Sequence, residues 1–167
     1  MVTASHNPAK YNGYKVYGDD GCQIGPETAD SIVNIIKSMP LFEEFDAPVN
    51  EGLISLIGED IENEFLKAVL TQQINPDAVK EAADNFKIIY TPFHGTGYKP
   101  VMKAFNAIGL KNVYTVKEQC VPDGDFPTVK SPNPEDKEGF TIGIEMAKKL
   151  DVDLILGTDP DCDRVGI

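Results

Sequence analysis

Short apolar stretches alternate with longer amphipathic ones in the second half of the chain. Strands are predicted at residues 86–90, 112–116 and 152–157, where each apolar stretch is bounded by turn residues. Helices are predicted at about 99–108 and 133–150, each with a proline near its start. This order predicts a parallel sheet covered by helices, with ligands beyond the carboxyl ends of the strands.

The first half of the chain predicts a hairpin followed by helices. Residues 14–17 and 22–24 are expected to pair around a turn at 18–21. Pro26 is expected to begin a helix that Pro40 stops.

Two more helices are predicted before the first strand. The first covers about residues 59–72, and the second begins at a cap formed by Asn75 and Pro76. The longer helix is expected to bury one apolar stripe, formed by Ile61, Phe65, Leu66, Val69 and Leu70.

The charge balance argues against some partners. With 15 basic and 27 acidic residues the net charge is −12, whereas nucleic acids and anionic membranes bind basic faces. No apolar run reaches the roughly 18 residues of a membrane span, and no signal-peptide pattern begins the chain. Three widely spaced cysteines without a CxxC pair indicate free thiols in a reducing cytosol and predict a cytoplasmic protein.

Three aspartates at alternate positions, Asp159, Asp161 and Asp163, follow the last predicted strand. Residues two apart in an extended backbone point to the same side, so we expect the three carboxylates to converge. Converging carboxylates repel one another unless a cation lies between them, and their oxygen atoms suit Mg²⁺ or Ca²⁺. The alternative is a solvated acidic turn capped by Arg164.

The spacing favours Mg²⁺ over Ca²⁺. An EF-hand loop needs glycine at its sixth position, where this chain has Arg164. A site with few protein ligands, and with positions for a phosphate oxygen, suits Mg²⁺ better.

A serine, a histidine and a lysine near the start of the chain are candidate reactive groups. Ser5 lies in a polar loop that Asn7 fixes, where it can be a nucleophile or an ordinary turn residue. Adjacent side chains of an extended chain point apart, so we expect His6 to bond the loop or a phosphate rather than activate Ser5. Lys15 is either a surface lysine or a proton donor and acceptor beside a phosphate.

The loop at residues 91–97 connects a predicted strand to a helix and contains two glycines. Such loops bind phosphate through backbone N–H groups or simply turn the chain, and the second use is favoured here.

Together these motifs resemble the α-D-phosphohexomutase superfamily, which comprises phosphoglucomutases and phosphomannomutases. The stretches that carry the resemblance are residues 3–8, 12–17, 94–97 and 159–164. The resemblance implies an α/β fold of three-layer α/β/α domains, with mixed or parallel sheets, helices on both faces and an incomplete first domain. It implies part of domain 1 at residues 1–45, a linker at 46–58 and domain 2 at 59–167.

The resemblance also implies roles for individual residues. Ser5 is similar to the serine that carries the phosphoryl group, and Lys15 to the general acid and base. Arg164 is similar to the cation that orients the phosphoryl group, and His6 belongs to the active-site loop. The implied Mg²⁺ ligands are Asp159, Asp161, Asp163 and an oxygen on phosphorylated Ser5.

By the same resemblance, the parent enzyme interconverts hexose 1-phosphate and hexose 6-phosphate, with hexose 1,6-bisphosphate as activator. We expect negligible activity from this chain alone, because the family's sugar-recognition and distal phosphate motifs are not in it. Open sheet edges are expected to favour self-association. The alternatives are a phosphopentomutase-type substrate, a non-catalytic divalent-metal module, and a phosphotransferase with an aspartyl nucleophile.

Overall fold

The computed structural model describes residues 1–42 and 48–167, and its contacts divide the chain into two units. One unit contains residues 1–3 and 13–57, and the other contains residues 4–12 and 58–167. The predicted boundary between residues 45 and 46 lies outside the described residues. Among the described helices, none has the length and apolar character that crossing a membrane requires.

The smaller unit contains the predicted hairpin in a reduced form. Tyr17 pairs with Gln23 in an isolated antiparallel bridge, and the Gly18 N–H donates to the Cys22 carbonyl at 2.8 Å. Gly21 has a φ of +77°, a left-handed conformation that glycine adopts without steric cost. The predicted turn is therefore confirmed, although an isolated bridge joins its two arms where continuous strands were expected.

The first predicted helix is also confirmed. Helix α1 covers Pro26–Ser38, with proline in its first turn, and a 3-10 turn follows at Glu51–Leu53. Proline fits this position because the first N–H groups of a helix have no partner within the helix.

The larger unit is built on a four-stranded mixed sheet. Its strands stand in the order β2-β1-β3-β4, and their bounds are Lys87–Thr91 for β1, Asn112–Thr115 for β2, Leu154–Thr158 for β3 and Val165–Gly166 for β4. Strand β1 pairs with β2 and β3 in parallel, and β4 pairs with β3 in antiparallel. The three predicted strands are confirmed within two residues, and β4 was not predicted.

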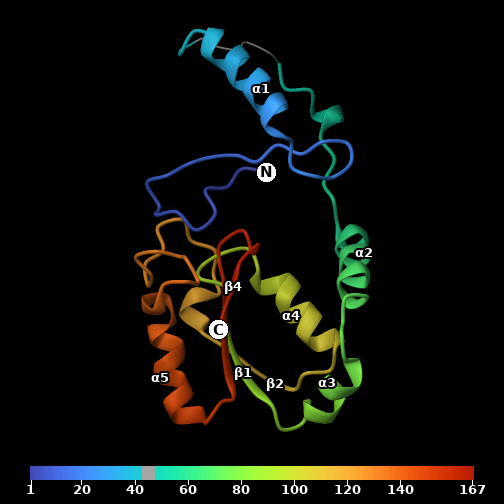
Figure 1. The fold of residues 1–167 in the computed structure, drawn as a ribbon, viewed down its shortest axis with the longest axis vertical. Coiled ribbons are helices and arrows are strands. Elements are labelled where there is room, and N and C mark those ends of the chain that lie inside the picture. The colour runs from blue at the N-terminus through green and yellow to red at the C-terminus, as the bar shows by residue number, and fades with distance from the viewer. Residues whose placement is uncertain (43–47) are drawn as a thin grey trace. The chain divides into compact units, whose positions relative to one another are not determined.

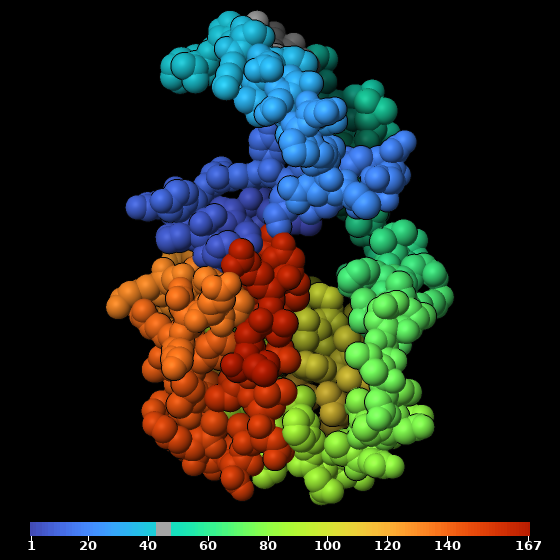
Figure 2. Space-filling model, viewed as in Figure 1, coloured from blue at the N-terminus to red at the C-terminus, as the bar shows by residue number. Residues whose placement is uncertain are grey.

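Helices cover both faces of this sheet. Helix α5 (Thr141–Leu150) and helix α4 (Tyr98–Ala107) lie on opposite sides of it (Figure 1). In the space-filling view the red C-terminal segment lies between the orange of α5 and the olive of α4 (Figure 2). Helix α2 (Glu59–Leu70) contacts α4. The α/β fold class is confirmed, with a mixed rather than wholly parallel sheet.

The helix that precedes the first strand begins as its sequence predicts. Helix α3 covers Pro76–Ala82, and the Asn75 side chain accepts a hydrogen bond from the Ala78 N–H at 3.1 Å. That bond satisfies one of the N–H groups that the start of a helix leaves without an internal partner.

Two helix predictions are wrong in detail. The helix predicted from residue 133 begins only at Thr141, after a 3-10 turn at Lys137–Phe140. Its expected first turn is instead an Asn133 turn, in which the Asn133 side chain accepts from the Glu135 N–H at 3.2 Å. The stripe expected to be buried on α2 is largely exposed, with Phe65 at 62%.

Buried side chains lie on both faces of the sheet. Ile89 of β1 is fully buried and lies close to α5, since a Cβ on Gly143 would stand 3.6 Å from its methyl group. Tyr90 is fully buried on the other face, edge-to-face with Phe105 of α4 at 5.9 Å between ring centroids.

Phe93 packs edge-to-face on Phe140 with ring centroids 5.1 Å apart. Gly157 of β3 lies directly beneath these rings, since a Cβ there would stand 2.7 Å from two Phe140 ring atoms. This packing fixes the end of β3, from which the acidic loop leaves the sheet.

Candidate active site

Ser5 lies in a tight turn with an unusual backbone. Its φ is +52°, a left-handed value that few residues other than glycine adopt. Asn7 holds the turn by donating to the Ala4 carbonyl from its backbone at 3.1 Å and from its side chain at 3.0 Å. The predicted role of Asn7 in fixing this loop is confirmed.

The left-handed turn changes the relation between Ser5 and His6. The Ser5 hydroxyl lies 3.2 Å from His6 Nδ1, within hydrogen-bond reach. The expectation that these side chains point apart is wrong, because it assumed an extended backbone and the chain here turns. His6 can therefore orient the serine hydroxyl directly.

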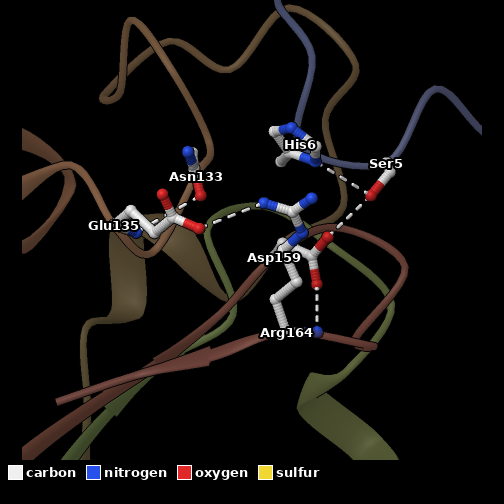
Figure 3. Close-up of polar contacts among 6 residues, drawn as sticks. All are labelled: Ser5, His6, Asn133, Glu135, Asp159 and Arg164. Carbon is white, nitrogen blue, oxygen red and sulfur yellow. Dashed lines mark hydrogen bonds and ion pairs between the residues drawn. The ribbon is translucent and has the colours of Figure 1, made fainter.

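The two ends of the unit's sequence meet at the carboxyl end of β3. The Ser5 hydroxyl donates to Asp159 Oδ2 at 2.9 Å, although 154 positions separate the two residues (Figure 3). Asp159 directly follows β3, at the edge of a sheet where α/β folds place their ligands. The structure thus brings Ser5, His6 and Asp159 into one site.

The acidic loop converges, but not in the way its alternation predicted. Pro160 and Asp161 form a turn, the Cys162 N–H donates to the Asp159 carbonyl at 3.0 Å, and Cys162 has a φ of +61°. The expected extended backbone is therefore wrong. The convergence itself is confirmed, since one oxygen of each aspartate lies within 4.8 Å of the others.

Asp159 is the buried member of the acidic loop. Its Oδ1 accepts from the Asp163 N–H at 3.1 Å and from the Arg164 N–H at 2.9 Å. Burial and the neighbouring Asp161 carboxyl raise the pKa of Asp159, against the hydrogen bonds from Arg164 and Ser5 that lower it. Keeping this carboxylate ionised in the folded chain is therefore unfavourable, and a nearby cation would offset that cost.

The donor set fits a hard divalent cation. Three carboxylates and a hydroxyl offer oxygen atoms alone, which is the set that Mg²⁺ and Ca²⁺ prefer. The ligands come from one tight loop and one distant turn, which leaves coordination positions for water or a phosphate oxygen.

Arg164 is oriented by a residue that the sequence interpretation missed. Its Nη1 lies 3.4 Å from Glu135 Oε1, and the Glu135 N–H is held by the Asn133 side chain (Figure 3). Both side chains are substantially exposed, so the pair contributes little stability. The pair places the guanidinium beside Glu135, and the Asn133-Pro134-Glu135 stretch was interpreted from the sequence as the start of a helix.

Lys15 belongs to the other unit, in the segment that forms the hairpin. Its N–H donates to the Met1 carbonyl at 2.8 Å, and the N-terminal amine donates to its carbonyl at 3.0 Å. Its role in proton transfer stays a prediction.

The glycine-containing loop after β1 is used for structure. The N–H groups of His94, Gly95 and Thr96 donate to the carbonyls of Gln119, Pro92 and Pro160, at 2.8 Å each. Because these donors bind protein acceptors, they do not form a phosphate cradle. The favoured structural use of this loop is confirmed.

An apolar cavity of about 450 Å³ lies between α2 and α4 and reaches the acidic loop at Asp161 and Cys162. Its walls include Phe65, Leu66 and Val101. Glu62, Thr96, Lys103 and Asp161 add polar groups to this lining.

Two family models match the chain. The model described as "Phosphoglucomutase/phosphomannomutase, alpha/beta/alpha domain II" matches residues 63–167, and the corresponding domain I model matches residues 1–41. The acidic loop lies in the first matched region, and the serine turn in the second.

Curated relatives extend the match over almost the whole chain. A phosphoglucomutase from Staphylococcus saprophyticus is 39% identical, over 99% of this chain and 30% of its own length. A phosphomannomutase from Mycoplasmoides pirum is 33% identical, over 100% of this chain and 30% of its own length. The chain therefore spans about 30% of the length of these relatives.

Solved structures agree on the fold. A crystal structure from Thermus thermophilus matches with a TM-score of 0.68 and 22% identity, over 99% of this chain and 35% of that one. A phosphoglucomutase/phosphomannomutase family protein from Burkholderia thailandensis matches with a TM-score of 0.57 and 21% identity, over 98% of this chain and 31% of that one. With the domain II model covering more than half of the sequence, the chain belongs to the phosphoglucomutase/phosphomannomutase family.

Proposed function

We propose that this chain supplies the phosphoryl-carrying serine and the metal-binding loop of a phosphohexomutase. The observation that carries the proposal is the contact between the Ser5 hydroxyl and Asp159, at a loop where Asp161 and Asp163 also converge. A phosphoserine at this position brings about −1.5 to −2 charge toward three carboxylates. Such a site works only if cations balance that charge.

The chain's own residues divide the chemistry among them. Ser5 Oγ is the oxygen that carries the phosphoryl group. In the unphosphorylated serine the hydroxyl donates to Asp159 Oδ2 at 2.9 Å and lies 3.2 Å from His6 Nδ1. Arg164, directed by Glu135, offers a fixed positive charge for phosphoryl oxygens. Mg²⁺ would be held by the three aspartates and an oxygen at Ser5, and it would supply charge neutralisation for the transferred group.

In each half-reaction one bond to phosphorus replaces another. When phosphoserine donates, the bond between Ser5 Oγ and phosphorus breaks as a sugar hydroxyl oxygen bonds the phosphorus. We propose that Lys15 takes the proton of the sugar hydroxyl and passes it to the leaving Ser5 Oγ, so that the serine hydroxyl is restored. The bisphosphate then returns its other phosphoryl group to Ser5 by the reverse step. Catalysis of this kind depends on positioning and charge stabilisation.

Phosphoryl labelling tests this proposal. The chain is incubated with Mg²⁺ and glucose 1,6-bisphosphate, and in parallel with acetyl phosphate, a small donor that needs no sugar recognition. Mass spectrometry is expected to locate the phosphoryl group on Ser5 and to find none there in Ser5→Ala. Ser31→Ala is the matched control, because Ser31 is exposed on α1 and bonds the Glu27 carbonyl. Label on an aspartate instead would favour the alternative aspartyl nucleophile.

Metal titration tests the cation site separately. Asp161→Asn is expected to weaken Mg²⁺ binding in isothermal titration, because it removes a charged ligand from the converging set. Asp125→Asn changes an exposed aspartate of another loop and should leave binding unchanged. Equal affinities for Asp161→Asn and the parent chain would contradict the three-aspartate site.

Self-association through open sheet edges is a further part of the proposal. Among the described residues, β2 pairs with β1 alone, so its outer edge offers unpaired backbone groups. Sedimentation velocity over a concentration series is expected to show a rising average mass. A single monomeric species at every concentration would contradict this expectation.

A further inference from the structure

The acidic loop packs against residues that are neither candidate Mg²⁺ ligands nor part of the turn at Ser5. Strands β1 and β3 are adjacent and parallel, with Thr91 opposite Gly157, so the loops that follow them leave the sheet side by side. The first of these loops contains residues 94–97, and the second contains the three aspartates. Their packing restricts the shape that the acidic loop can take.

The first restraint acts on the peptide between Pro160 and Asp161. The Pro160 carbonyl accepts two hydrogen bonds from Thr96, from its N–H at 2.8 Å and from its hydroxyl at 3.0 Å. The proline ring already fixes φ at this residue, so its ψ is the remaining soft angle. Holding the carbonyl fixes that ψ, and with it the direction in which Asp161 leaves the turn.

The second restraint is a buried group of three polar atoms beneath the loop. Tyr90 Oη and Thr158 Oγ1 form a buried hydrogen bond of 2.9 Å, and the Cys162 thiol lies beside them. A Cβ added to Gly97 would stand 2.7 Å from Cys162 Sγ, 2.8 Å from Tyr90 Oη and 3.0 Å from Thr158 Oγ1. The three atoms therefore gather around Gly97, whose lack of a side chain leaves room for them.

The buried group explains how a strained turn persists. Cys162 holds a left-handed conformation, which is unfavourable for a residue other than glycine. Such a conformation persists only where the surroundings hold it in place. Tyr90 is fully buried and Thr158 nearly so, and both adjoin the loop that contains Cys162.

The close approach of the two loops leaves no room for adjustment. A Cβ on Gly95 would stand 2.3 Å from Pro160 Cα. The backbone of the first loop is thus in direct contact with the backbone of the acidic loop, so displacement of one is transmitted to the other.

We propose that Tyr90 and Thr96 are positioning residues, which hold the acidic loop in the turn where its three carboxylates converge on a divalent cation. This inference rests on the proposed Mg²⁺ site. Neither residue needs to touch the cation, and both act through the backbone that places Asp159, Asp161 and Asp163.

The test measures Mg²⁺ affinity by isothermal titration in Tyr90→Phe and Thr96→Val, which remove only the hydroxyl function. Each variant is expected to weaken Mg²⁺ binding by roughly 10- to 100-fold, the range seen when outer-shell partners of metal ligands are removed. Thr96→Ser keeps the hydroxyl and should restore the affinity of the parent chain. Tyr114→Phe, the same change on neighbouring strand β2, should leave affinity unchanged.

Urea unfolding in EDTA separates positioning from general stability. If Tyr90→Phe and Thr96→Val lower the unfolding midpoint but keep Mg²⁺ affinity, the residues are merely structural and the inference is overturned. If Tyr90→Phe does not fold, the Thr96→Val and Thr96→Ser pair decides, because Thr96 lies on the surface. If the parent chain binds no Mg²⁺, the proposed metal site fails and this inference fails with it, whereas strong binding by every variant refutes the inference alone.

Discussion

In the larger unit, a single buried polar side chain holds several segments of the chain together. Gln119 is fully buried and connects the end of β1, the loop that contains Thr128 and the 3-10 turn that contains Gly139. Its side chain accepts from the Thr91 hydroxyl and donates to Thr128 at 3.0 Å and to the Gly139 carbonyl at 3.3 Å. Its backbone carbonyl accepts from the His94 N–H. One polar side chain thus fixes the loop that leads to Gly95 and Thr96.

Replacing Gln119 should therefore be costly. Gln119→Leu leaves the buried Thr91 hydroxyl and Gly139 carbonyl without their partner, and unpaired buried groups cost about 1–3 kcal/mol each. Urea unfolding should show a loss of about 2–4 kcal/mol. Gln72→Leu, which changes an exposed glutamine near the end of α2, should stay within about 0.5 kcal/mol of the parent chain.

The three cysteines should differ in reactivity. Burial raises the pKa of the Cys120 and Cys162 thiols, whereas Cys22 is exposed. Because the thiolate is the nucleophile, a raised pKa lowers the reactive fraction near neutral pH. Iodoacetamide should label Cys22 first, and labelling of Cys162 should continue to accelerate above pH 9.0, the ordinary pKa of a thiol. Peptide mass spectrometry would contradict this if all three reacted at one rate.

At the scale of elements, the packing of β3 against α5 and its preceding turn decides where the acidic loop begins. Gly143 on α5 lies close to Ile155 and Ile89, since a Cβ there would stand 3.3 and 3.6 Å from their methyl groups. Gly157 on β3 lies even closer to Phe140. Small residues at these positions allow the helix and the sheet to meet closely.

Adding one methyl group at Gly157 tests this packing. Gly157→Ala is expected to destabilise the chain by about 1–3 kcal/mol, because the rigid Phe140 ring occupies the space. Gly124→Ala is the control, since nothing lies within 4 Å of a Cβ there. Equal unfolding free energies for the two variants, measured in urea, would contradict the close packing.

At the scale of the whole molecule, the site joins segments from opposite ends of the sequence. Residues 4–12 belong to the same unit as the sheet, and Ser5 contacts Asp159 across 154 positions. Closing so long a loop has an entropic cost that local contacts must offset. A cation bound between the serine turn and the acidic loop would add to those contacts.

Magnesium should therefore stabilise the folded chain. A ligand that binds the folded state alone adds about 2.7 kcal/mol at a concentration one hundred times its Kd. Urea unfolding with and without Mg²⁺ is expected to show an increase of this order in the parent chain. Asp161→Asn should lose most of the increase, whereas an equal increase in that variant would attribute the effect to general salt.

Sequence patterns predicted the secondary structure well wherever local chemistry dominates. Pro26 and the Asn75 cap placed helix starts correctly, and the apolar stretches placed β1, β2 and β3 within two residues. The convergence of Asp159, Asp161 and Asp163 was also predicted, although from an extended backbone that the loop does not have.

Tertiary structure alone decided the rest. The left-handed turns at Ser5 and Cys162, and hence the contact of Ser5 with His6, depend on packing that no local propensity encodes. Strand β4 depends on pairing with β3, and the exposure of Phe65 depends on what covers α2. The sequence by itself therefore determined which groups can act, because residue type and spacing are local properties. The three-dimensional fold determined how they are aimed, since that depends on contacts between residues distant in the chain.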